Sequence, residues 1–175
     1  MTSLARTRRR VLPLAPLAAM LAGAAVAAAA WAAPIDLHDY WDQRCSTCHG
    51  HSAEFARRWL TVEQGRLQGN HHRDDLARFL RNHYLSDDLV VPVMQMLAAQ
   101  ADQGSVFRDR CARCHGTAAE FARRSLEWRD GALYGRSGGK TVGDALKSHG
   151  GLSPAENAQM LDTLTRVRRE VAPQP

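Results

Sequence analysis

The sequence has no cysteine outside two short stretches and no basic tract interleaved with aromatic residues, and only 6% of its 175 residues are aromatic. The lack of such a tract argues against a nucleic-acid partner. The sequence also has no Ser/His/Asp arrangement and no carboxylate pair with a clear acid–base logic. Nothing in it therefore predicts acid–base or nucleophilic catalysis, and we expect a protein that is not itself an enzyme.

Positive charge is concentrated at the N-terminus. The whole chain has a formal net charge of +5, and four arginines lie among residues 6–10 with no acidic residue before position 33. Without those four charges the rest of the chain carries +1. Residues 11–33 are apolar, rich in Ala and Leu, and end in Ala30-Trp31-Ala32. This order is typical of a secretory signal peptide, with cleavage after Ala32.

An uncleaved membrane anchor is the alternative for this segment. The apolar run is long enough, because about 20 apolar residues span a bilayer. It is mostly Ala, however, and is interrupted by Pro13 and Pro16. In both cases the rest of the chain is predicted outside the cytoplasm, in a bacterial periplasm, and it contacts a membrane only if the segment stays uncleaved.

The four cysteines all belong to two C-x-x-C-H motifs, a spacing typical of c-type haem attachment. Two thiols on one turn can each form a thioether with a haem vinyl group. The histidine that follows then faces the iron and supplies a neutral imidazole as the proximal ligand. The cysteines are Cys45, Cys48, Cys111 and Cys114, and the proximal histidines are His49 and His115.

Three other interpretations of the cysteines are weaker. A zinc site made of both pairs does not explain the histidine after each second cysteine, and the gap between the pairs is unlike a compact zinc ribbon. A thioredoxin-like redox motif expects a βαβ context that the sequence lacks. Disulfides between the pairs would leave both histidines without a role.

With these motifs the chain resembles a dihaem c-type cytochrome built from two tandem class-I-like cytochrome c modules. The resemblance covers nearly all of the chain after its N-terminal segment. It implies an all-α fold in which each helical module surrounds one covalent haem c. It also implies an electron carrier between redox proteins, with a membrane-bound oxidoreductase as one such partner. The expected boundaries are residues 1–32 for the signal, 33–101 for the first module and 102–175 for the second.

An internal repeat with a period of 66 residues supports two modules. Residues 45–60 and 111–126 match at most positions, and Gly65, Leu67, Gly69 and Leu80 correspond to Gly131, Leu133, Gly135 and Leu146. Each copy predicts a leading helix, the haem loop, a short helix, a glycine-bounded turn, a helix, a loop and a closing helix. The leading helices are expected over 36–44 and 103–110. The closing helices are expected to start at Ser86 and Ser153, both good N-caps.

The sixth ligand of each iron is predicted from the repeat. The class-I cytochromes c that this chain resembles typically carry a Met in the loop before the last helix. The corresponding loop here, residues 146–152, contains no Met and has His149 at the expected position. His83 occupies the equivalent position in the first copy, so we expect His83 and His149 as distal ligands. Met160 lies on an apolar helical stripe and is expected in the core. The remaining histidines, His38, His51, His71 and His72, are expected at the surface.

Two histidine ligands on each iron predict a low-spin centre of lower potential than a Met/His haem. An alternative is one haem with an open sixth position, which would make the chain a small-ligand sensor or a peroxidase-like or oxidase-like enzyme. Another is a haem subunit of a membrane oxidoreductase. Phe55 and Phe121 are expected to pack in the haem pockets. The repeated arginine pairs 57–58 and 123–124 are expected either on a solvated helix face or against haem propionates.

Overall fold

A computed structural model describes residues 35–103 and 105–172 of the chain. The expected signal segment, residues 1–32, lies outside these ranges. The described chain is mainly helical, which agrees with the predicted α class. None of its helices has the length and apolar character needed to cross a membrane.

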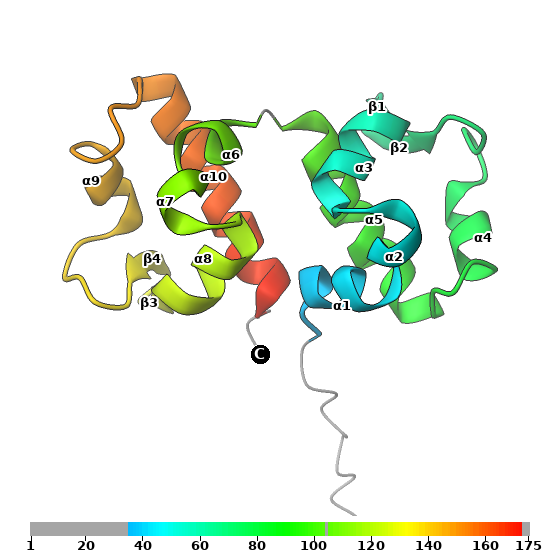
Figure 1. Cartoon of the computed structure of the whole chain (residues 1–175), viewed down its shortest axis with the longest axis horizontal. Helices are drawn as coiled ribbons and strands as arrows, with labels where there is room; N and C mark the ends of the chain where they lie inside the picture. Colours follow the sequence, from blue (N-terminus) through cyan, green and yellow to red (C-terminus); the bar gives the residue numbers. More distant parts are fainter. Residues whose placement is uncertain (1–34, 104, 173–175) are drawn as a thin grey trace, which may run out of the picture. The chain divides into compact units, whose positions relative to one another are not determined.

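The same order of elements occurs twice (Figure 1). We call residues 35–103 the first repeat and residues 105–172 the second repeat. The first repeat contains α1 (Leu37–Arg44), α2 (Ser46–His49), α3 (Ser52–Trp59), β1 (Leu60–Glu63), β2 (Arg66–Gly69), α4 (Leu76–Arg81) and α5 (Asp87–Asp102). The second contains α6 (Val106–Arg110), α7 (Ala112–His115), α8 (Ala118–Ser125), β3 (Leu126–Arg129), β4 (Ala132–Gly135), α9 (Val142–Leu146) and α10 (Pro154–Val171).

The glycine-bounded turns are β-hairpins, which the sequence analysis did not predict. β1 pairs antiparallel with β2, and β3 pairs in the same way with β4. Gln64 and Gly65 have φ values of 51° and 75°, and Asp130 and Gly131 have values of 49° and 77°. Positive φ at both central residues is the requirement of a two-residue type I′ turn.

The closing helices begin where the sequence predicts. α5 follows Ser86, and α10 follows Ser153, whose side chain and that of Glu156 form a reciprocal capping box. Pro92 lies inside α5 without ending it. The second leading helix is shorter than predicted, because Gln103 caps the end of α5 and α6 starts only at Val106.

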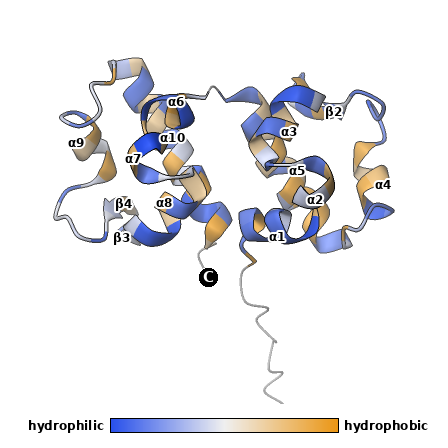
Figure 2. Ribbon diagram, in the orientation of Figure 1, coloured by the Kyte–Doolittle hydropathy of each residue, from blue (hydrophilic) through white to orange (hydrophobic). Residues whose placement is uncertain are grey.

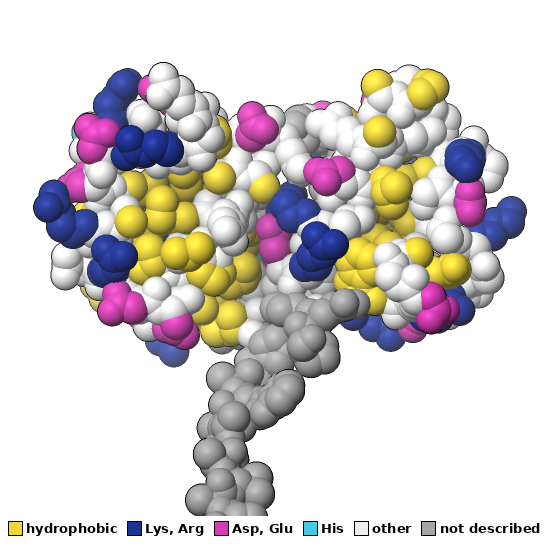
Figure 3. All heavy atoms as spheres, turned by 180° about the vertical axis from the view of Figure 1, so that it is seen from behind, with side chains coloured by type: hydrophobic (Ala, Val, Ile, Leu, Met, Phe, Trp, Pro, Cys, Tyr) yellow, Lys and Arg dark blue, Asp and Glu magenta, His cyan; other side chains and the backbone are white. Residues whose placement is uncertain are grey.

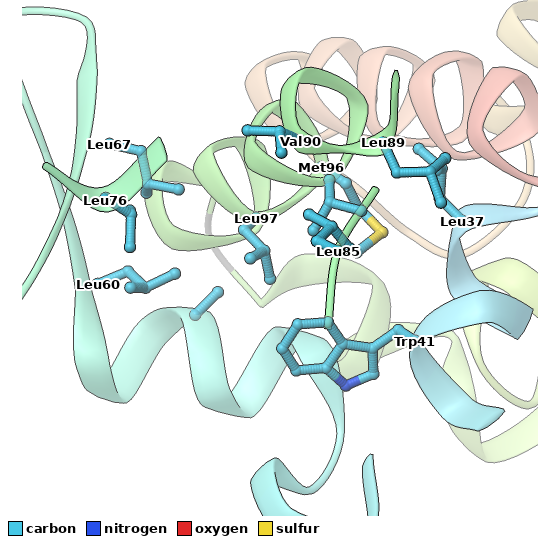
Figure 4. Packing of buried hydrophobic residues seen from close by; sticks show 12 residues of the cluster. Leu37, Trp41, Leu60, Leu67, Leu76, Leu85, Leu89, Val90, Met96 and Leu97 are labelled. Atoms are coloured by element: carbon cyan, nitrogen blue, oxygen red, sulfur yellow. The ribbon is translucent and has the colours of Figure 1, made fainter. Parts of the chain in front are cut away.

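Each repeat has its own hydrophobic core around its closing helix, and apolar and polar residues alternate along the helices (Figure 2). In the first repeat Trp41 of α1 lies close to Met96 and Leu97 of α5 (Figure 4). Met160 of α10 is 1% exposed in the second core, as predicted for a core residue. Not all apolar side chains are covered: hydrophobic atoms reach the surface of both repeats (Figure 3), and Val91 is 59% exposed.

A buried polar cluster connects α1 with α10. His38 is 7% exposed, and its Nε2 lies 2.8 Å from Oε2 of Glu170, a residue 132 positions away. The prediction of a surface His38 is therefore wrong, because α10 covers it. Arg166 donates to both carboxylate oxygens of Glu170 at 2.7 Å. Burial alone would raise the pKa of Glu170, but the hydrogen bond to His38 and the charge of Arg166 hold it below its usual value.

A second, bidentate contact joins the start of α1 to α8. Arg123 donates from Nε and Nη2 to the two carboxylate oxygens of Asp36, at 2.6 and 2.9 Å. Planar guanidinium–carboxylate pairs of this kind combine charge with fixed geometry. One member of the second arginine pair is thus engaged with a carboxylate of the protein itself.

We predict that Glu170→Gln lowers the free energy of unfolding at pH 7 by about 1.5–3 kcal/mol, since a buried charge-assisted hydrogen bond is lost. The folded-state pKa of Glu170 is lowered, so its contribution is present above its usual value of 4.5 and is lost as the pH falls through the folded-state pKa. Urea denaturation across this range should show the wild type and the variant converging at low pH. Glu54→Gln, at an exposed position of α3, is the matched control. A pH-independent difference would contradict the assignment.

Candidate functional site

The two cysteine motifs adopt the same single turn in both repeats. His49 donates its amide to the Cys45 carbonyl at 3.0 Å, and His115 makes the same bond to Cys111 at 3.0 Å. All four thiols are free. The second cysteine of each pair is exposed and the first is half-buried, so each motif presents two thiols and one imidazole from one turn of chain.

Burial affects the first cysteine of each pair. It raises the pKa of the Cys45 thiol, and in the same way that of Cys111, where the nearby Arg110 acts in the opposite direction. Both thiols are therefore protonated near neutral pH. Cysteines in this state are less reactive toward oxidants and metals than thiolates.

An aromatic residue from the following helix orients each motif histidine. Phe55 of α3 contacts the ring of His49 edge-on, with centroids 4.7 Å apart, and Phe121 of α8 contacts His115 at the same distance. The Trp41 indole donates to the carbonyl of Gly50, directly after the first motif, at 2.9 Å. The expectation that Phe55 and Phe121 pack beside the site agrees with these contacts.

The predicted distal histidines lie opposite the motif histidines. His83 follows α4 and faces His49, with ring centroids 5.9 Å apart and an angle of 67° between the rings. His149 follows α9 and faces His115, also at 5.9 Å and with an angle of 68°. The structure thus brings together both histidine pairs that the sequence predicted, with the same geometry.

This spacing suits one metal ion between two imidazoles. A nitrogen–metal bond is about 2.0–2.1 Å, as measured for zinc, so two bonds in line span about 4 Å. The centroid separation of 5.9 Å is of the size that such a pair requires once the distance from each nitrogen to its ring centre is added. Burial and the nearby His83 together lower the pKa of His49, which favours the neutral imidazole that metals bind.

The first histidine pair lies in a cleft with largely apolar walls. Cys45, Cys48, His49 and His83 all line it. The other walls come from α1, α3, β1, α4, the segment after α4 and the closing helix α5, with Trp41, Phe55, Leu60, Leu76, Phe79, Leu80, Leu85, Val93 and Leu97 among them. An apolar cleft with two thiols at one edge and an imidazole on each side fits a planar haem with two thioether bonds and two axial ligands.

The other histidines considered from the sequence lie outside these two histidine pairs. His51 and His71 are exposed, as expected, whereas His72 is half-buried against Phe79 and so differs from the expected surface residue. Among the described residues, no group of three or more His, Cys, Asp or Glu side chains is placed to hold a metal ion, so the four thiols do not converge on one zinc site. Arg124 donates to the His115 carbonyl at 3.3 Å.

Comparisons with protein-family models, with curated proteins and with solved structures found no match to this chain.

The glycine after each motif histidine has a backbone conformation that is nearly exclusive to glycine. Gly50 has φ 68° and ψ −159°, and Gly116 has φ 74° and ψ −151°. A Cβ on Gly116 would also lie 2.6 Å from Oε2 of Glu120, which caps α8. The turn out of each motif therefore depends on glycine.

We predict that Gly50→Ala and Gly116→Ala each lower the free energy of unfolding by about 1–3 kcal/mol, the cost of a residue forced into such a region. Gly116→Ala should be the more severe, because it also displaces Glu120. Gly135→Ala is the control, since nothing lies within 4 Å of the added Cβ. Urea denaturation of the three variants measures the effect. Equal stability of all three would show that the backbone at Gly50 and Gly116 is not constrained as described.

Proposed function

We propose that this chain is an exported dihaem c-type cytochrome that transfers electrons between redox proteins in a bacterial periplasm. The observation that carries the proposal is the pair of facing imidazoles, repeated with a 5.9 Å centroid separation in both halves of the chain. In each half one imidazole follows a Cys-x-x-Cys turn. Cys45 and Cys48 would hold one haem c, and Cys111 and Cys114 the other.

The residues around each site support electron transfer rather than bond-breaking chemistry. When bound, each haem would supply an iron that gains and loses one electron. His49 with His83, and His115 with His149, would hold the two irons, each through two imidazole nitrogens. In the first repeat, Phe55 and the apolar walls of the cleft would limit the access of water, and so would limit the reorganisation that accompanies a change of charge.

The haem edges would be the places where electrons enter and leave. The second cysteine of each motif is exposed, so the thioether-bearing edge of each haem would lie near the surface. The two repeats contact one another through the Asp36–Arg123 and His38–Glu170 pairs. Such contacts would hold the two haems within one folded unit, which favours electron transfer from one haem to the other.

The test is expression of the full chain in a host with a periplasmic haem-attachment system. We expect a mass increase equal to two haem groups and the optical and electron paramagnetic resonance spectra of two low-spin, bis-histidine haems. Replacing both cysteines of one motif by alanine should remove one haem and leave the other. Absence of covalent haem, or a bound zinc ion in its place, would refute the proposal.

Histidine variants test the ligand assignment separately. We predict that His83→Ala and His149→Ala each convert one of the two haems to high spin, because each removes one axial ligand. His71→Ala and His51→Ala, at exposed positions, are the controls and should leave both spectra unchanged. A spectral change in His71→Ala with none in His83→Ala would transfer the distal role to His71.

A further inference from the structure

The two distal histidines have the same partner geometry but different surroundings. In the first repeat the His83 ring is stacked on Phe79 of α4, with centroids 4.8 Å apart and an angle of 21°. The ring of the exposed Tyr84, the next residue in the chain, lies edge-on to it at 5.2 Å. His83 is half-buried, and its stack with Phe79 restricts its rotation.

A second layer holds Phe79 in place. Its other face is stacked on His72, at 4.0 Å and 19°, and Nδ1 of His72 lies 3.1 Å from a carboxylate oxygen of Asp75. Phe79 is thus enclosed between two imidazoles, one of which is anchored to the residue that precedes α4. The backbone after His83 is also held, since the Tyr40 hydroxyl donates to the Tyr84 carbonyl at 3.3 Å.

The second repeat has none of these side chains. At the repeat-equivalent positions, Gly138 replaces His72, Ala145 replaces Phe79 and Gly150 replaces Tyr84. Within the described ranges, the aromatic contact of the His149 ring is with His115 alone. His149 is exposed and is followed by two glycines with φ values of 86° and 57°. Arg110 holds this loop from outside, through a 3.0 Å hydrogen bond to the Gly151 carbonyl.

These differences affect how readily each imidazole can leave the iron. His83 must break its stack with Phe79 to rotate away, whereas His149 moves into solvent on a glycine-rich loop without losing a stacking partner. One stacked aromatic pair changes such an equilibrium by roughly two- to tenfold. Burial and the Tyr84 contact act in the same direction, so the difference between the two sites is larger than that of one pair.

We propose that His149 is an exchangeable ligand, so that the second haem binds a small neutral diatomic molecule in the reduced state while the first haem does not. Phe79 is the positioning residue that makes the difference. The inference rests on the proposed dihaem function and adds a ligand-binding site to it. A neutral ligand is favoured because apolar side chains, Leu146 and Leu152 among them, flank the His149 loop and belong to the second core.

The experiment is titration of the reduced, haem-loaded full chain with carbon monoxide, with stoichiometry and rates followed optically. We expect one molecule bound per chain. His149→Ala should leave the stoichiometry at one. Carbon monoxide should then bind without waiting for the slow dissociation of the His149 imidazole from the iron. His83→Ala should raise the stoichiometry to two.

Exchanging the residue types at positions 79 and 145 tests whether Phe79 causes the difference between the two haems. Ala145 is exposed, so Ala145→Phe can be accommodated without disturbing the core, and it should slow binding at the second haem by roughly two- to tenfold, as expected for one stacked pair. Phe79→Leu keeps an apolar side chain but removes the stack, and should allow slow binding at the first haem that the wild type does not show. Ala145→Leu is the matched control for bulk and should bind like the wild type.

Several outcomes would overturn the inference. They are binding of none or two molecules by the wild type, a stoichiometry of two in His149→Ala, or equal effects of Ala145→Phe and Ala145→Leu. Unchanged binding in both Phe79→Leu and Ala145→Phe would also overturn it. All of these are measured on protein that carries two covalently attached haems, so they are distinct from failure of the proposed function, in which no haem is attached.

Discussion

The gap between two imidazoles in each repeat is the constraint on which the rest of the structure depends. The motif histidine lies at the end of a four-residue helix, α2 or α7, and the facing histidine follows a second short helix, α4 or α9. Helices this short have little stability of their own. The gap is therefore held by what packs behind them, which is the closing helix of the same repeat.

The closing helices perform this role through the helix that follows each motif. α5 packs against α3 and β1 in the first repeat, and α10 packs against α8 in the second. Ala56 of α3 and Ala122 of α8 are fully buried at the same position of the repeat, which lets the helices approach closely. Trp41 and Phe107 complete the arrangement from the leading helices, and both are buried. A small core of this kind gains from a large apolar group in the cleft beside it, since a domain of this size buries little surface alone.

Much of the site could be predicted from local sequence because its signals are local. The Cys-x-x-Cys-His turns, the starts of the closing helices after Ser86 and Ser153, and the position of His83 and His149 in the repeat all lie within short stretches. The second hairpin has a local signal too, Asp130-Gly131, a dipeptide that strongly indicates a type I′ turn. The burial of His38 had none, because its partner lies 132 residues away on another helix. A lone histidine on a short helix does not reveal which distant element covers it.

The repeat also has a limit as a guide to function. It aligns His83 with His149 and correctly places both opposite a motif histidine, but alignment of ligands does not imply equal behaviour. Ligand identity sets which atoms can reach a metal, while the neighbours of the ligand set how long it stays there. Phe79 and Ala145 occupy the same position of the repeat, and only the former presents a ring to its histidine. The two repeats therefore differ one layer behind these histidines, where a substitution would change how readily the imidazole moves without changing its nitrogen atoms.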